Sequence, residues 1–342
     1  MIKENMIKVH AIGESGYNNQ LHDVAHIRLF LPLQLLADEG QILLTKDVSY
    51  EGYEESDVFI IQRTWSYSLT INKAETFIKM IKLKNKKLIY EIDDNLLDNQ
   101  NIMSLSKKII YLLAKNADMI ITSTPELKKR FLNISNNIIV ISNFLDSRLL
   151  YERRNVFRKN EKIIIGYMGT ATHQKDFHMI KLPLMRVLQK YKSKICLEIV
   201  GSLEDESVIQ FMPNTSIKIL NKVKDYFSFW EWMNNNCFWD IGIAPLKYSE
   251  FTKCKSDIKY LDYSALGIAG IYSNHPAYEN SIKDRETGLL VDNNCDSWQI
   301  AIEELIRNDE LRNSIRNSAH NDLWKNRILQ NNVNLWLDVI NK

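Results

Sequence analysis

Short apolar runs recur along the chain, and amphipathic segments of helical length separate them. In the first half the apolar runs, each of which predicts a buried strand, are 7–12, 41–45, 58–62, 87–91, 119–122 and 138–142. Between them the segments 27–37, 73–83 and 125–132 repeat apolar residues at the three- and four-residue spacing of one helix face. Strands that alternate with helices predict β-α-β units and a parallel sheet.

The alternation stops in a charged stretch at 151–161 and then restarts. The second series of apolar runs is 162–168, 196–200, 217–220, 241–244, 268–272 and 288–291, and the tail from Ser297 is helical in pattern. A length of 342 residues also suits two domains. We therefore predict an α/β protein with two Rossmann-like domains that face each other across a cleft. Their predicted bounds are 1–153 and 154–325, and residues 326–342 are predicted to form a helix that returns to the first domain.

Composition and charge exclude several classes of protein. The chain has 44 basic and 42 acidic residues. The first 152 residues hold 18 of the basic and 19 of the acidic residues. Neither half is the basic body that binds nucleic acid through its phosphates. The four cysteines include no CxxC pair, which argues against a disulfide framework and a zinc ribbon. No apolar run approaches the length of a membrane span. We expect a cytoplasmic protein without a nucleic-acid partner.

The segment 243–273 carries the most chemistry, because ligands of such sheets bind at the carboxyl ends of the strands. It reads as strand, loop, helix and strand, with Ser256 as the predicted N-cap. Lys255, Lys259 and Asp262 share one face of this helix. A helix N-terminus with a hydroxyl and two lysines suits a diphosphate, and a carboxylate two turns further suits a ribose. An exposed helix without a ligand is the alternative reading. The remaining apolar positions predict the buried stripe: Ile258, Leu261 and Ala265.

This segment resembles the nucleotide-sugar-binding helix of GT-B glycosyltransferases of family four, the type named glycosyl transferases group 1. One bacterial branch carries K-S-x-x-K-x-L-E-Y-x-A-x-G there. The matching residues here are Lys255, Ser256, Lys259, 261–263, Ala265 and Gly267, and the branch's D-I-G-I-A-P-L strand matches 240–246. The resemblance implies that Asp262 binds the nucleotide ribose. Eight residues earlier many members carry a glutamate that touches the donor sugar, and this chain carries Cys254.

Other strand ends of the second domain resemble the same family. The loop 169–176 begins with a glycine, which lets backbone approach a phosphate. The resemblance implies that Lys175 neutralises the diphosphate and that His173 touches the leaving phosphate, although an ordinary surface lysine and a solvated loop histidine are the alternatives. It also implies donor contacts at further positions: Gly169, Thr170, Gly201 and Val223.

The first domain has its own polar residues at predicted strand ends. Asp93 and Asp94 follow the run 87–91, where two carboxylates suggest a metal site, sugar hydrogen bonds or caps of the next helix. GT-B enzymes generally need no bound metal, so the resemblance favours contact with substrate. Arg63 and Gly16, at two other strand ends, are predicted to lie on the acceptor side.

Together the residues and the resemblance imply an enzyme that moves a sugar from a nucleotide-diphosphate donor to an acceptor hydroxyl. The expected reaction retains the anomeric configuration and serves cell-surface polysaccharide or glycoconjugate synthesis. The expected catalytic residues are Asp93, Asp94, Lys175 and Lys255, with no metal and no cofactor. The expected partners are the nucleotide-sugar and a glycan or lipid-linked acceptor, with a peripheral membrane contact. Two alternatives stay open: a non-catalytic binding subunit of the same fold, and another GT-B enzyme such as a sugar-nucleotide epimerase or a polyol-phosphate transferase.

Overall fold

The computed structural model describes residues 6–16, 20–151, 162–201, 212–218 and 225–342. Contacts divide the chain into two units. Unit 1 holds Met1–Ser147, Cys254–Ser256 and Ile328–Lys342, and unit 2 holds Arg148–Lys253 and Asp257–Arg327. The end of the chain and a three-residue segment from the middle therefore belong to the first unit.

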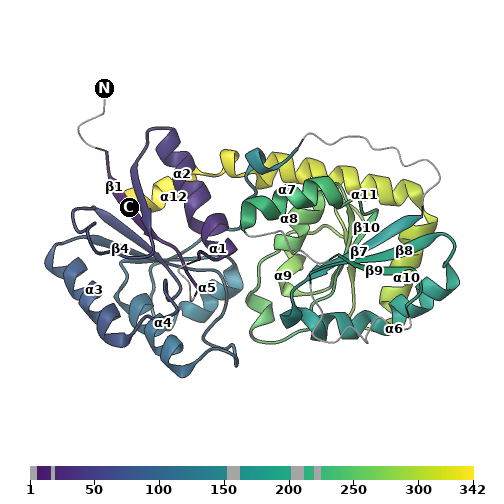
Figure 1. Ribbon diagram of the computed structural model, residues 1–342, viewed down its shortest axis with the longest axis horizontal. Helices are drawn as coiled ribbons and strands as arrows, with labels where there is room; N and C mark the ends of the chain where they lie inside the picture. The colour runs from purple at the N-terminus through teal and green to yellow at the C-terminus, as the bar shows by residue number, and fades with distance from the viewer. Residues whose placement is uncertain (1–5, 17–19, 152–161, 202–211, 219–224) are drawn as a thin grey trace. The chain divides into compact units, whose positions relative to one another are not determined.

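Unit 1 is built on a parallel sheet of six described strands, two of which, β1 and β4, are labelled in Figure 1. The strand order is β2-β1-β3-β4-β5-β6. The strands are β1 (Lys8–Ile12), β2 (Leu43–Asp47), β3 (Val58–Gln62), β4 (Lys87–Ile92), β5 (Met119–Thr122) and β6 (Ile138–Val140). Every residue of β3 is buried, as expected for a central strand covered on both faces. In the register of β3 and β4, Gln62 lies opposite Glu91, so the residues that follow both strands start from the same edge of the sheet.

Helices cover both faces of this sheet. The helices are α1 (Asp23–Ala25), α2 (Leu31–Asp38), α3 (Ile71–Leu83), α4 (Ser104–Asn116), α5 (Pro125–Phe131) and α12 (Asn334–Asn341). Right-handed crossovers from β3 through β6 place α3, α4 and α5 on one face. The connection from β1 to β2 runs the other way along the sheet, so α2 covers the opposite face, where α12 contacts it. The Lys87 ammonium donates to the carbonyls of Val339 and Ile340 at 2.8 and 3.0 Å, which ties the end of α12 to β4.

The predicted helix over 27–37 is interrupted. A π-helical stretch, His26–Phe30, connects α1 to α2. Pro32 stands in the first turn of α2 and has no N–H to donate. The π-helical stretch is a single wider turn inserted between two α-helical segments.

Unit 2 repeats the architecture, with six described parallel strands in the order β12-β11-β10-β7-β8-β9. The strands are β7 (Ile163–Gly169), β8 (Ile195–Gly201), β9 (Thr215–Lys218), β10 (Ile241–Ala244), β11 (Ala269–Ser273) and β12 (Leu289–Val291). The helices are α6 (Gln174–Lys190), α7 (Tyr226–Asn236), α8 (Ile258–Ala265), α9 (Pro276–Glu279), α10 (Cys295–Arg307) and α11 (Asp309–Asp322).

The core of unit 2 lies between the sheet and a pair of helices. α6 and α10 contact each other, and their buried residues, among them Phe177, Leu184 and Trp298, join one cluster with the strands. α8 contacts β11 and α11. Both units are thus α/β units with parallel sheets, as the alternating pattern predicts. Among the described residues no helix is long and apolar enough to cross a membrane.

Candidate functional site

Two glycines end neighbouring strands of unit 2. Gly169 closes β7, Gly201 closes β8, and the two residues are paired in the register of the sheet. Gly201 has a φ of +111°, and a Cβ atom there would lie 2.1 Å from the Gly169 carbonyl oxygen. This edge of the sheet is therefore backbone without side chains, which is the surface that a phosphate approaches most closely.

The turn after β7 holds its histidine in a fixed orientation. His173 Nδ1 lies 2.9 Å from an oxygen of the buried Asp176 carboxylate, whose other oxygen accepts from the Lys247 backbone N–H at 2.8 Å. Lys175 lies beside them, exposed in the first turn of α6. Thr170 is also exposed, and its hydroxyl lies 2.8 Å from that of Thr172. Asp176 was not among the predicted site residues, although an aspartate three residues after a loop histidine is a usable signal.

The N-cap of α8 is Asp257, so the prediction of Ser256 as the cap is wrong. The Asp257 side chain makes no capping bond. It instead accepts two hydrogen bonds from Arg327 at 2.7 and 2.9 Å in a buried pair. A bidentate guanidinium partner outweighs the hydrogen bond that a capping carboxylate would accept from a backbone N–H, because both groups of the ion pair are charged.

Asp262 lies inside unit 2 rather than on its surface. Asp262 is only 9% exposed, because α8 is enclosed by β11 and α11 and all of Tyr260–Ser264 is buried. Burial raises the pKa of the Asp262 carboxyl to about 7, and Asp257 adds to the rise, while Lys259 opposes it. No hydrogen bond to this carboxylate is found within the described residues, and its oxygens are not among the fully enclosed polar atoms that lack a partner.

Lys259 connects α8 to the glycine edge. Its ammonium donates to the Met168 carbonyl at 2.6 Å, one residue before Gly169. The helix that carries Asp262 is therefore fixed to the carboxyl end of β7. Among the predicted donor residues this edge holds Gly169, Thr170, His173, Lys175 and Gly201, and α8 carries Lys259 and Asp262, whereas Val223 lies outside the described residues.

The segment just before α8 makes its contacts in unit 1. Cys254 is fully buried in the core cluster of unit 1, and its carbonyl accepts from the Thr124 hydroxyl at 2.9 Å. The Lys255 ammonium lies 3.8 Å from an Asp94 oxygen. The Ser256 hydroxyl accepts from the Asn143 amide at 2.9 Å.

In unit 1 the predicted Arg63, Asp93 and Asp94 come together. Arg63 donates to both oxygens of Asp93, at 2.6 and 2.9 Å, and lies 3.5 Å from Asp94. Burial alone would raise the pKa of the Asp93 carboxyl, but the Arg63 guanidinium outweighs burial and lowers it. Arg63 has a φ of +48°, a left-handed conformation that non-glycine residues rarely adopt.

The loop after β1 adds charged residues that were not among the predicted site residues. The Glu14 carboxylate accepts from Arg63 at 2.7 Å and lies 3.3 Å from His22 Nδ1. Burial would raise the pKa of Glu14, but His22 and Arg63 together lower it. Gly16 lies in this loop, where its N–H donates to the Gln20 carbonyl at 2.9 Å and a Cβ would lie 3.2 Å from the His22 ring.

A second ion pair lies beneath this cluster. Glu91, fully buried at the end of β4, accepts from Arg28 at 2.7 Å and from Gln62 at 2.8 Å. Arg28 also donates to the Ile141 carbonyl and to Asn143. A glutamate inside an otherwise apolar run is a signal that could have indicated this buried pair, which was not predicted. Over the residues that the structure describes, no group of three or more His, Cys, Asp or Glu side chains is placed to hold a metal ion.

Comparison with known proteins supports the architecture. HepE from Anabaena, crystallised with UDP and glucose, is similar with a TM-score of 0.65 at 11% identity, over 97% of this chain and 98% of HepE. A glycosyltransferase from Rickettsia africae is similar with a TM-score of 0.64 at 15% identity, over 98% of both chains. The fold is the GT-B fold.

TarM is a third similar structure, with a TM-score of 0.64 at 18% identity over 86% of this chain. The present chain spans only 57% of the length of TarM. No family model matches this chain, and no curated protein matches it. At these identities the likeness establishes the fold, and the activity has to be argued from the residues.

Proposed function

We propose that this protein is a glycosyltransferase that takes its sugar from a nucleoside-diphosphate donor bound in unit 2. The observation that carries the proposal is Asp262, a buried carboxylate on a helix that Lys259 fixes to the glycine edge. A buried carboxylate without a hydrogen-bonding partner is costly, and native proteins rarely keep one without a purpose. A ribose supplies two hydroxyl donors on adjacent carbons, which is the complement of one carboxylate.

The shared fold supports the same choice of ligand. HepE, which matches nearly the whole chain, was crystallised with UDP, with UDP-glucose, and with UDP and glucose. A parallel α/β sheet binds its ligand beyond the carboxyl ends of the strands, where Gly169 and Gly201 lie. We therefore take UDP as the first probe.

In the proposed reaction the bond from the anomeric carbon to the diphosphate oxygen breaks, and a bond to the acceptor oxygen forms on the same face. The acceptor proton passes to the departing diphosphate. Lys175 and Lys255 stabilise the negative charge that develops there, together with His173 and the N-terminus of α8. No metal ion takes part in the proposed step, and the proposed product is a cell-surface glycan.

The two aspartates of unit 1 differ in what they offer an acceptor. Both oxygens of Asp93 already accept from Arg63, so Asp93 acts by positioning that arginine. Asp94 is 22% exposed, and its shortest distance to Arg63 is 3.5 Å, longer than either contact between Arg63 and Asp93. We assign the contact with the acceptor hydroxyl to Asp94.

Binding of UDP and of uridine to the full chain, measured by calorimetry, tests the donor site. Asp262→Asn keeps the shape of the side chain and removes its charge. Because hydrogen bonds to charged groups are worth about 1.5–3 kcal/mol, the variant should lose about tenfold or more in affinity for both ligands. Lys175→Ala should lower the affinity for UDP and leave the affinity for uridine unchanged, since uridine has no phosphate.

The matched control is Asp296→Asn, which removes the same charge from an 85% exposed side chain of unit 2. It should bind both ligands like the wild type. If Asp262→Asn binds UDP as tightly as this control, Asp262 does not hold the ribose and the proposed donor site is wrong.

Cys254 gives the binding-subunit alternative its one specific observation. Where many glycosyltransferases of the resembling branch place a glutamate, this chain has a thiol buried in the core of unit 1. A protein that binds UDP but forms no UDP from UDP-sugars, whichever acceptor is offered, would be a binding subunit. Turnover of any UDP-sugar would exclude that alternative.

A further inference from the structure

The turn between β7 and α6 holds His173 close to the glycine edge of unit 2. The Tyr167 hydroxyl, which comes from β7, donates to the His173 carbonyl at 3.3 Å. The same hydroxyl lies 2.8 Å from the position that a Cβ atom of Gly169 would take. His173 is also the N-cap residue of α6, and its N–H donates to the Thr170 carbonyl at 2.9 Å. His173 therefore stands in a hydrogen-bonded turn next to the backbone of Gly169.

The Asp176 carboxylate decides which nitrogen of the His173 ring turns away from it. One Asp176 oxygen lies 2.9 Å from His173 Nδ1, and the other accepts from the Lys247 backbone N–H at 2.8 Å. Because a carboxylate only accepts hydrogen bonds, Nδ1 carries a hydrogen and donates. Nε2 then lies on the opposite side of the ring, and 24% of the His173 side chain is exposed.

The protonation state of this ring determines what Nε2 can bind. With a hydrogen on Nδ1, a neutral imidazole offers Nε2 as an acceptor, and only the protonated ring offers an Nε2–H donor. The oxygens of an ionised diphosphate accept hydrogen bonds. His173 can therefore hold a diphosphate through Nε2 only as an imidazolium.

The surroundings of Asp176 favour that charged form. Within the described residues, His173 is the one basic side chain that lies within 4.0 Å of the buried Asp176 carboxylate. Burial lowers the pKa of the facing His275 to about 4, although the Asp176 charge opposes this. Burial and the Asp176 charge together raise the pKa of the Tyr167 and Tyr278 hydroxyls. These neighbours are thus neutral near pH 7, and the carboxylate charge favours a proton on His173.

The lysines around the turn are placed differently. The Lys259 ammonium donates to the Met168 carbonyl at 2.6 Å. Lys175 and Lys247 are exposed, and a long exposed side chain loses rotamer freedom when it binds a ligand. The His173 ring, which Asp176 already orients, avoids most of that cost.

We infer that Asp176 is a positioning residue, which holds His173 as an imidazolium whose Nε2–H donates to the nucleoside diphosphate. This role rests on the proposed function and deepens it, because it names the group that keeps a diphosphate-binding side chain oriented and charged. No proton leaves the imidazolium. When the bond from the anomeric carbon breaks, its electron pair passes to the diphosphate oxygen, which takes up the acceptor proton. The Nε2–H bond strengthens as negative charge develops there.

Calorimetric binding of UDP and of uridine to the full chain, between about pH 6 and pH 9, tests the role of the imidazolium. His173→Gln keeps a polar side chain of similar size and removes the charge. The ratio of wild-type to variant affinity cancels the titration of UDP itself. For UDP we expect a ratio on the order of ten at about pH 6, which approaches one at about pH 9, where the imidazole is neutral. For uridine, which has no phosphate, the ratio should stay near one.

Asp176→Asn tests the positioning residue itself. The amide oxygen can still accept from the Lys247 N–H, but the charge that favours the imidazolium is gone. The pH at which UDP affinity falls should therefore move down by about one unit or more. A purely structural role would lower the affinity for UDP and uridine alike and leave the pH dependence in place. In the His173→Gln background, Asp176→Asn should no longer change the preference for UDP over uridine.

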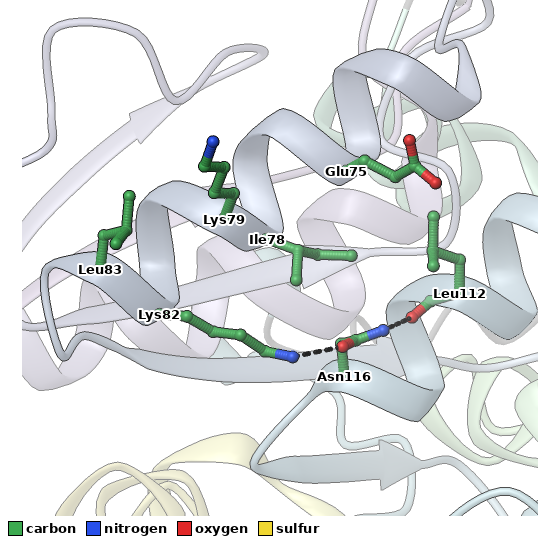
Figure 2. Close-up of a pocket in the computed structure, with 7 residues that line it drawn as sticks. All are labelled: Glu75, Ile78, Lys79, Lys82, Leu83, Leu112 and Asn116. Atoms are coloured by element: carbon green, nitrogen blue, oxygen red, sulfur yellow. Dashed lines mark hydrogen bonds between the residues drawn. The ribbon is translucent and has the colours of Figure 1, made fainter.

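The matched control is Glu75→Gln, which also converts an acid to its amide. Glu75 is exposed on α3 in unit 1, at a hollow between α3 and α4 (Figure 2). The hydrogen bonds drawn there join Lys82 to Asn116 and Asn116 to the Leu112 carbonyl. The control should bind both ligands like the wild type at every pH. Circular dichroism establishes that all variants are folded.

The outcomes distinguish this role from the proposed function. A wild type that binds neither UDP nor uridine would contradict the proposed function and the role of Asp176 with it. Where the wild type binds UDP and Asp262→Asn weakens that binding, the donor site is supported. In that case a pH-independent ratio for His173→Gln, or an unshifted pH dependence for Asp176→Asn, would overturn the role of Asp176 alone.

Discussion

The two units have sheets of the same kind, and their carboxyl edges differ in how charge is balanced. In unit 1 the acidic groups described above have cationic partners: Asp93 has Arg63, Glu91 has Arg28, and Glu14 has Arg63 with His22 beside it. In unit 2 Asp257 is likewise paired with Arg327, and Asp176 with His173. Asp262, however, has no hydrogen-bonding partner within the described residues, and the Lys259 ammonium donates to a backbone carbonyl.

This difference separates structural charges from charges that await a ligand. A buried acid with its own guanidinium is neutralised inside the protein, and removing either partner leaves the other uncompensated. A buried acid without a partner weakens the folded state instead, and a ligand that donates hydrogen bonds relieves the cost. We expect substitutions at the two edges to change stability in opposite directions.

The largest expected effect is the loss of Arg63. Arg63→Met leaves Asp93 and Glu14 without their shared cation, and breaking a buried pair in this way costs about 3–5 kcal/mol of unfolding free energy. Urea denaturation measures the change. The control Arg186→Met removes an exposed arginine whose nearest carboxylate oxygen is 3.9 Å away, and it should cost about 0.5 kcal/mol or less. A loss below about 1 kcal/mol in Arg63→Met would show that unit 1, too, awaits a ligand.

Asp262→Asn should change stability in a pH-dependent way. The folded-state pKa is about 7, above the ordinary value of about 3.9, so the folded protein binds more protons between these values and wild-type stability falls as pH rises from about 4 to 7. Asp262→Asn has no ionisable carboxyl at this position, so its unfolding free energy does not fall in this way. Relative to wild type, its unfolding free energy should rise by about 2–4 kcal/mol between pH 4 and pH 8, at about 1.36 kcal/mol per pKa unit.

Denaturation of Asp262→Asn at several pH values measures that rise, with Asp296→Asn as the exposed control. A difference from wild type that stays constant with pH would mean that Asp262 is paired in the folded protein. The contrast between the two edges would then disappear.

The smallest effect concerns the backbone of the glycine edge. Gly201→Ala places a Cβ 2.1 Å from the Gly169 carbonyl at a φ of +111°, whereas Gly52→Ala, at +87°, meets no atom within 4 Å. Strain alone costs about 1 kcal/mol or more, so the overlap should make Gly201→Ala worse than Gly52→Ala by about 2 kcal/mol. Thermal denaturation compares the two. Equal losses would mean that the edge can open by itself to admit a side chain.

Some of the site follows from local sequence. The runs 58–62, 119–122 and 241–244 are strands with the predicted bounds, because each is a short apolar run whose neighbours end it. The sequence pattern also allows the contact between Arg63 and Asp93 to be expected. Both residues follow strands, and the carboxyl ends of adjacent parallel strands lie at one edge.

What the sequence determined by itself, then, was the alternation of strands and helices, and with it which side chains stand at strand ends. The tertiary structure decided their surroundings. Asp257 stands at the N-cap of α8 in place of Ser256 but makes no side-chain capping bond, and Arg327, seventy residues later, takes its carboxylate. Asp262 is buried because α11 closes over α8, with the Tyr260 hydroxyl donating to Asp322 at 2.6 Å. Helical periodicity is a property of neighbouring residues, whereas burial and charge compensation depend on partners that are distant in the chain and only packing brings near.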